Sequence, residues 1–174
     1  MPRSFDISAD SEGSVEDVLQ AYREEDYWLA RLAGSGVDDA KLESLRVGGE
    51  SGNDGTIDVV TLQVLRSDKL PGLITQVHRG DLCIKRAETW GPVCDGVATA
   101  TIAGSIEGAP ANVSGTAKLS PTAESGGSRL DCRLTVQVRV PLIGGKLENF
   151  IGAQLANLVE AEQRFTAGWI TNNG

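Results

Sequence analysis

The chain has 174 residues, with 16 Lys or Arg against 24 Asp or Glu, so its formal net charge at pH 7 is −8. An acidic surface repels phosphate backbones and anionic membrane surfaces, and we therefore expect no nucleic-acid partner. No stretch approaches the roughly 18 apolar residues that a membrane span requires, and no basic start precedes an apolar run. The composition thus predicts one soluble, cytoplasmic domain over residues 1–174, without integral membrane association.

Three cysteines, Cys83, Cys94 and Cys132, lie far apart without CxxC spacing, and a single histidine accompanies them. A zinc site or a disulfide framework needs closer or more numerous ligands. We therefore expect free thiols, and neither a metal nor a cofactor.

The first 36 residues predict a strand followed by helical turns. Weak alternation predicts a strand over Arg3–Ala9. Ser14 is suited to cap a helix, because its hydroxyl can accept a hydrogen bond from an orphan amide of the first turn. Apolar residues at helical spacing continue to Leu32 past an acidic interruption at 24–26, which indicates two short helices or one broken helix.

The middle of the chain predicts strands separated by glycine- and proline-rich breaks. They are Leu42–Val47, Ile57–Leu65, Leu82–Trp90, Val97–Ile106, Ala111–Ser120 and Ser128–Val140. The apolar positions change parity within Ile57–Leu65, which predicts a bulge near Val59. Leu70–His78 differs from its neighbours, because Pro71 opens a short piece with helical spacing that forms either a short helix or a lid.

The end of the chain carries the clearest pattern. In Ser128–Val140 apolar residues alternate strictly with polar ones, which predicts one core face and one solvent face. Pro141–Asn172 then predicts one long amphipathic helix. Its apolar stripe comprises Ile143, Leu147, Phe150, Ile151, Leu158, Ala161, Phe165 and Trp169. Outside this stripe the wheel places Lys146, Glu148, Asn149, Asn157, Glu160, Gln163 and Arg164.

This order of elements resembles the helix-grip fold of the START and Bet v 1-like superfamily, also called SRPBCC, over essentially the whole chain. The opening Arg3-Ser4-Phe5, the later Tyr27-Trp28-Leu29 and the junction from Val140 to Glu148 are similar to an uncharacterised actinobacterial family, DUF2505. The resemblance implies an α+β fold in which a curved antiparallel sheet of about seven strands grips the C-terminal helix around a hydrophobic cavity. Superfamily members include lipid and sterol carriers, polyketide cyclases, hormone receptors and chaperone activators, so the fold does not determine the function.

Side-chain size supports a cavity on the concave face. Small residues such as Ala100 and Gly104 alternate with Ile102 on one strand, and the next strand shows the same pattern. Small residues leave volume unless large ones opposite fill it, and in the alternative interpretation aromatic residues close over these positions as ordinary core. The residues that we expect to contact a ligand are Trp28, Trp90, Ala100, Ile102, Phe150, Gln154 and Leu158.

Gln154 is the large polar residue that the wheel places within about 20° of the centre of the apolar stripe. A buried amide without a partner costs about 1–3 kcal/mol, so we expect a partner for it. Two interpretations are open: the amide orients a ligand, or it bonds a strand backbone or a buried water.

Other candidate polar groups are Arg86, Glu88 and His78. Because a buried ion needs a partner, the favoured interpretation turns Arg86 and Glu88 outward and places their neighbours Cys83, Lys85, Ala87 and Thr89 at the interior. His78, the only histidine, is either a general base at the cavity mouth or a solvated loop residue. We assign no catalytic residue.

Three functions follow as hypotheses. The first is binding or transport of a hydrophobic small molecule, such as a lipid, a fatty acyl compound or a polyketide. The alternatives are an enzyme of the polyketide cyclase or hydratase kind, using His78, Glu88 or Gln154 in the same cavity, and a ligand-free protein-interaction module. The lack of a nucleophile motif favours binding over catalysis.

Overall fold

The computed structural model describes residues 2–35, 39–49, 51–66, 68, 72, 80–122 and 126–173. In chain order, its elements are β1 (Arg3–Ser11), α1 (Val15–Tyr22), α2 (Glu25–Ala33), β2 (Asp39–Val47), β3 (Ile57–Leu65), β4 (Leu82–Trp90), β5 (Ala98–Ile106), β6 (Ala111–Pro121), β7 (Ser128–Val138) and α4 (Gly144–Asn173). The predicted segment Leu70–His78 lies outside the described residues apart from Gly72.

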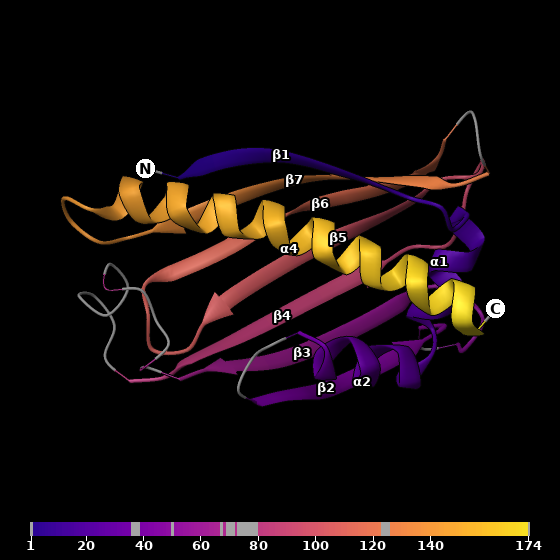
Figure 1. Ribbon diagram of the computed structural model, residues 1–174, viewed down its shortest axis with the longest axis horizontal. Coiled ribbons are helices and arrows are strands. Elements are labelled where there is room, and N and C mark those ends of the chain that lie inside the picture. The colour runs from indigo at the N-terminus through magenta and orange to yellow at the C-terminus, as the bar shows by residue number, and fades with distance from the viewer. Residues whose placement is uncertain are drawn as a thin grey trace.

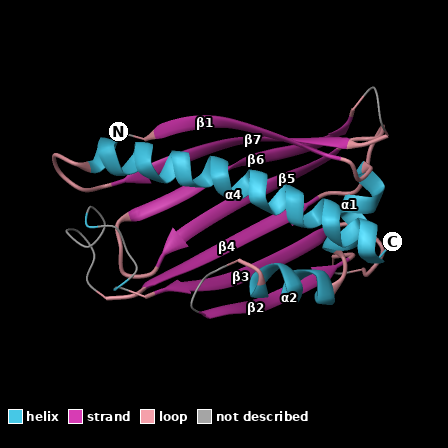
Figure 2. Cartoon of the chain, viewed as in Figure 1, coloured by secondary structure: helices cyan, strands magenta, loops and turns pink. Residues whose placement is uncertain are grey.

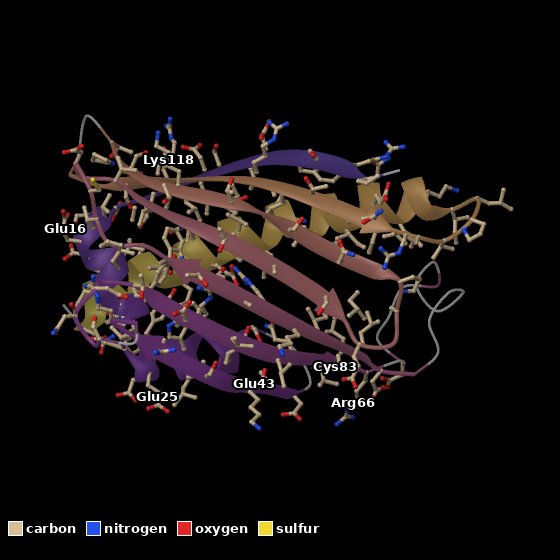
Figure 3. All side chains as sticks on the ribbon, turned by 180° about the vertical axis from the view of Figure 1, so that it is seen from behind. Glu16, Glu25, Glu43, Arg66, Cys83 and Lys118 are labelled. Atoms are coloured by element: carbon tan, nitrogen blue, oxygen red, sulfur yellow. The ribbon has the colours of Figure 1, made fainter. Side chains whose placement is uncertain are left out.

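The strands form one seven-stranded antiparallel sheet in the order β1-β7-β6-β5-β4-β3-β2. α4 crosses one face of this sheet diagonally, running beside β1 and β7 (Figure 1). α1 and α2 lie at the end of the sheet where α4 finishes (Figure 2). Seen from behind, the other face of the sheet has no described helix over it (Figure 3). The predicted α+β helix-grip architecture is therefore confirmed.

Local sequence signals explain the two short helices. The Ser14 hydroxyl accepts a hydrogen bond from the amide of Asp17 at 3.1 Å, which caps the start of α1 as predicted. Glu16 and Asp17 in the first turn also favour the positive end of the helix. The chain leaves the helical conformation at Glu24, the N-cap of α2, so the acidic interruption separates two helices.

The core lies between the sheet, α1, α2 and the C-terminal half of α4. Tyr22 contacts the rings of Tyr27, Trp28 and Trp90, with centroids 5.5–5.6 Å apart. Ala98, Ala100 and Ala117 supply small side chains on the same inner face of the sheet, and all are buried. Large rings from the helices thus fill the space that small strand residues leave at this end.

Two details of the sheet differ from the predicted pattern. The register shift lies between Leu42 and Ser44 of β2, not near Val59 of β3. β3 keeps one parity throughout, since Ile57, Val59 and Thr61 are all buried on the inner face. The predicted bulge near Val59 is wrong, because the apolar residues that suggested it lie half-buried on the outer face of a regular strand.

Close approach of α4 to the sheet depends on small and polar residues. A Cβ atom at Gly152 would lie 2.3 Å from the Phe5 ring, so the ring occupies the space that glycine leaves. Glu148 is fully buried and accepts a hydrogen bond from the Val138 amide at 2.9 Å, where β7 ends. The helical wheel placed Glu148 and Gln163 outside the apolar stripe, yet both side chains are buried.

None of the described helices is long and apolar enough to cross a membrane.

Candidate functional site

A cavity of about 110 Å³ lies between α2, the inner face of β3 and β4, and the C-terminal half of α4. The helices line it with the apolar side chains of Trp28, Leu32, Leu158 and Phe165 and with the charged side chains of Arg31 and Glu162. The sheet contributes Thr61 and Gln63 of β3 together with Arg86 and Glu88 of β4.

Four charged side chains form a connected cluster at this cavity. Arg86 donates to both carboxylate oxygens of Glu162, at 2.7 and 2.9 Å, and to Oε1 of Glu88, at 2.7 and 3.1 Å. Arg31 contacts Oε2 of Glu162 at 2.5 Å. Glu162 on α4 therefore connects α2 to β4, and we call Arg31, Arg86, Glu88 and Glu162 the charged cluster.

Aromatic residues hold Arg31 in place. Its guanidinium lies 4.7 Å from the centroid of the Trp28 ring and donates to the Tyr27 hydroxyl at 3.2 Å. The Tyr27 hydroxyl in turn lies 2.6 Å from the Thr166 hydroxyl on α4. Trp28 is fixed by its own indole N–H, which donates to the Tyr22 carbonyl at 2.8 Å. The charged cluster thus rests on a rigid aromatic support.

The two arginines also determine the protonation of the cluster. Burial alone would raise the pKa of Glu162, but Arg31 and Arg86 outweigh it and lower this pKa to about 2. The pKa of Arg86 moves upward despite burial, because Glu162 and Glu88 stabilise its charged form. Glu162 is therefore ionised and paired throughout the physiological range.

The favoured outward orientation of Arg86 and Glu88 is wrong, because both side chains line the cavity. They share the inner face of β4 with Trp90, whose burial fixes the parity of the strand. Their charges are tolerated there because Glu162 of α4, 76 residues away from Arg86, supplies a counterion. By the same parity Lys85 and Thr89 lie on the outer face, and both are exposed.

Glu88 keeps one acceptor available to the cavity. Its Oε1 accepts both hydrogen bonds from Arg86. Its Oε2 accepts none from the described residues, and the Glu88 side chain, which lines the cavity, keeps 7% of its surface exposed. A group entering the cavity would meet this oxygen.

Beyond the charged cluster, the inner face of the sheet remains partly open. Ile102 lies opposite Glu88 in the β4–β5 register, and Gly104 lies opposite Arg86. From there toward the far end of the sheet, inward-facing apolar side chains are half-buried rather than buried. These residues, which we call the open apolar stretch, are Ile84, Ile102, Ile106 and Val113 on the sheet and Ile151, Leu155 and Leu158 on α4.

The structure brings only some of the predicted ligand-binding residues to the cavity. Trp28 and Leu158 line it, and Ile102 lies beside Glu88. Trp90 and Ala100 are buried in the core. Phe150 is half-buried on α4, further from the cavity.

The expected burial of Gln154 is wrong, since its side chain is exposed. The most deeply buried face of α4 runs through Gly152, Val159 and Thr166. The stripe of large apolar residues, including Leu158 and Phe165, lies roughly 100° around the helix from that face and turns toward the cavity. Gln154 lies near the centre of this stripe, which is turned away from the deepest face of α4, and its side chain reaches solvent, so neither interpretation of a buried amide applies.

Two residues of the charged cluster, Arg31 and Glu162, were not anticipated from the sequence. Glu162 stands four residues after Leu158 and three before Phe165, and a charge at that spacing in an apolar stripe is the signal that a buried partner is needed. His78, considered as a general base, lies outside the described residues. In the described part of the chain, no group of three or more His, Cys, Asp or Glu residues is placed to hold a metal ion.

A second depression, of about 670 Å³, involves the opposite face of the sheet. Its exposed lining includes Thr89, Thr101, Thr116 and Lys118, the last of which is labelled in Figure 3. None of the residues of the charged cluster lines this depression.

A sheet gripping a long C-terminal helix, with a cavity between them, is the helix-grip fold of Bet v 1-like proteins. Solved structures of this class align with the chain: norcoclaurine synthase from Thalictrum flavum, in complex with dopamine and hydroxybenzaldehyde, has a TM-score of 0.56 at 11% identity over 100% of this chain and 89% of that one. The crystal structure of Ara h 8.0201 has a TM-score of 0.52 at 13% identity, covering 99% of this chain and 100% of that one. These likenesses show the fold.

Within that class the chain belongs to the family described as protein of unknown function DUF2505, whose model matches residues 6–170. Uncharacterized proteins of Mycobacterium tuberculosis and Mycobacterium bovis are 67% identical to it over 173 residues, which is 99% of each chain. The predicted family membership is confirmed.

Proposed function

We propose that this protein binds a hydrophobic small molecule, such as a lipid or a polyketide-like compound, between the sheet and α4. The observation that carries the proposal is the open apolar stretch. Exposed apolar surface costs about 25 cal/mol per Å², and a ligand placed against Ile102, Ile151 and Leu155 would remove such surface from water. The apolar half of the cavity, at Trp28 and Leu158, continues this surface.

The expected contacts follow from the register of the sheet. Ile102 is adjacent to Glu88, so a ligand lying on the open apolar stretch would reach the charged cluster at one end. Trp28 and Leu158 would contact that end of the ligand. Phe150 would contact the chain further along α4. Trp90 and Ala100 support the site from the core.

A filling substitution tests this placement. Ile102→Trp adds bulk on the inner face of β5, and Thr101→Trp adds the same indole ring on the outer face of the same strand. Binding of the uncharged dye Nile red, measured by fluorescence titration, should be saturable in the native protein. We expect Ile102→Trp to weaken this binding by about tenfold or more and Thr101→Trp to leave it unchanged.

Circular dichroism confirms that both variants are folded before they are compared. Saturable binding lost on Thr101→Trp but retained on Ile102→Trp would place the ligand in the outer depression and contradict the proposal. A native protein that binds no dye, and that releases no small molecule when it is extracted with organic solvent, would also contradict it.

The alternative of an enzyme rests on one observation, the inward position of Glu88 with a carboxylate oxygen available to the cavity. Glu162 does not suit the role of general base at neutral pH, because its low pKa leaves it little tendency to take up a proton. An enzyme would therefore depend on Glu88. This second function would be supported if the protein converted a polyketide-like substrate, and if Glu88→Gln abolished the conversion but still bound the substrate.

A further inference from the structure

The charged cluster points to the chemical class of the ligand's polar end, and the inference rests on the proposed function. Arg31 and Arg86 carry two positive charges, and Glu88 and Glu162 carry two negative ones. The cluster is therefore electrically neutral, and its strongest donors and acceptors already satisfy one another.

A charged ligand group would upset this balance. A carboxylate in the cavity would lack an unpaired cation, because Arg31 and Arg86 both contact Glu162. Its own charge would be taken out of water without compensation, a large cost in a low-dielectric site. An ammonium group could reach Oε2 of Glu88, but Arg31 and Arg86 already balance the charges of Glu88 and Glu162, so its added positive charge would be left without compensation.

An uncharged hydroxyl fits the groups that remain. It can donate to Oε2 of Glu88, which accepts no hydrogen bond from the described residues. Its oxygen can accept from a neutral donor on the same side of the cavity, such as the Thr61 hydroxyl or the Gln63 amide. The cavity volume of about 110 Å³ suits such a group and the few carbon atoms next to it, not a whole lipid chain.

We propose that the natural ligand is an uncharged amphiphile with a hydroxyl end, such as a long-chain alcohol, an acylglycerol or a sterol-like molecule. Its hydroxyl contacts Glu88 in the cavity, and its apolar part lies on the open apolar stretch. Fatty acid anions and alkyl amines of the same length bind more weakly, because the cluster has no unpaired charge for them.

A matched series of ligands tests this choice. 1-Dodecanol, dodecanoate and dodecylammonium share one chain and differ in charge. Their dissociation constants can be measured by displacement of Nile red at about pH 8, below their aggregation concentrations. We expect the alcohol to bind the native protein at least about tenfold more tightly than either ion.

Two variants then change the charge of the cavity. Glu88→Gln keeps the shape of the side chain and gives the cluster a net positive charge, and Gln63→Lys adds a positive charge at a half-buried position of the cavity wall. Each should shift the preference toward dodecanoate by about tenfold or more. Glu160→Gln, the same change at an exposed position on α4, should leave the preference of the native protein unchanged.

The possible results distinguish failure of this inference from failure of the proposed function. If dodecanoate binds the native protein as tightly as the alcohol, or if neither charge variant alters the preference, the assignment of an uncharged ligand is overturned while the binding function stands. Should none of the three ligands nor the dye bind, the proposed function fails and this inference fails with it. Two independent charge variants keep the test decisive should one of them not fold.

Discussion

At the scale of single residues, Glu162 holds the cavity wall together. It accepts hydrogen bonds from Arg86 with both oxygens and contacts Arg31, so it joins α2, β4 and α4 through one carboxylate. Removing it would leave two largely buried guanidinium groups without their shared partner. Breaking a buried pair in this way is among the few single changes that cost several kcal/mol.

We therefore expect Glu162→Ala to lower the free energy of unfolding by about 3 kcal/mol or more. The matched control is Glu160→Ala, two residues earlier on the same helix, where the carboxylate forms an exposed pair with Arg164. That change should cost no more than about 0.5 kcal/mol. Urea denaturation followed by circular dichroism measures both, and equal costs would show that the charged cluster does not stabilise the fold.

The low pKa of Glu162 predicts a dependence of stability on acid. Because this pKa lies at about 2 in the folded protein against 4.5 for a free glutamate, the ionised form stabilises the fold above pH 4.5, and that stabilisation is lost as the pH falls toward 2. Such a shift corresponds to at most about 3 kcal/mol. Between these pH values the native protein should lose more stability than Glu162→Gln does. Parallel pH profiles of the two proteins would contradict the assignment.

At the scale of elements, α4 is positioned by glycine and polar residues on one face and carries its large apolar residues on another. Gly152 admits the Phe5 ring, while Leu158 and Phe165 turn toward the cavity. This division lets one helix bind the edge of the sheet closely and still present an apolar surface to the space inside. The geometry of the site thus depends on the packing of Gly152.

Two glycine substitutions on α4 should have opposite effects. Gly152→Ala places a methyl group against Phe5 and should destabilise the protein by about 1–3 kcal/mol. Gly168→Ala meets nothing within 4 Å and should stabilise it by about 0.5–1 kcal/mol, because alanine is the better helix former. Thermal unfolding of both variants checks the pair. A stabilising Gly152→Ala would mean that Phe5 moves aside freely.

Much of this fold was predictable, because its signals are local. Strict alternation in β7, the Ser14 cap of α1 and the break before α2 each depend on neighbouring residues, and the structure confirms them. The charged cluster depends instead on residues far apart in sequence. Arg86 and Glu162 meet only because α4 crosses the sheet at one particular register, which no local pattern encodes.

Gln154 shows the limit of the helical wheel. A helical wheel shows the direction in which the large apolar residues of a helix point. The deepest face of α4 is formed by Gly152, Val159 and Thr166, and two of these, Gly152 and Thr166, are not large apolar residues and so contribute little to that direction. The predicted apolar stripe exists, but it faces the cavity and not the part of β1 that lies closest to α4. Gln154 points in the direction of this stripe and not toward the deepest face, and its side chain therefore reaches solvent.

At the scale of the whole molecule, the two faces of the sheet differ in kind. The inner face has a closed core beneath α1 and α2, then the charged cluster, then the open apolar stretch. Apart from the half-buried Val60, Leu62 and Val64 of β3, the outer face is mainly polar, with a row of threonines at Thr89, Thr101 and Thr116 on neighbouring strands. An apolar ligand is therefore expected on the inner face only.

Nuclear Overhauser effects between a bound apolar ligand and methyl groups of the protein test this central claim most directly. With 1-dodecanol present, we predict cross-peaks from the alkyl chain to the methyl groups of Ile84, Ile102 and Leu158, which lie on the inner face or on α4. The methyl groups of Val60 and Leu62, half-buried on the outer face of β3, should show none. Cross-peaks to Val60 and Leu62 without any to Ile102 and Leu158 would contradict the account.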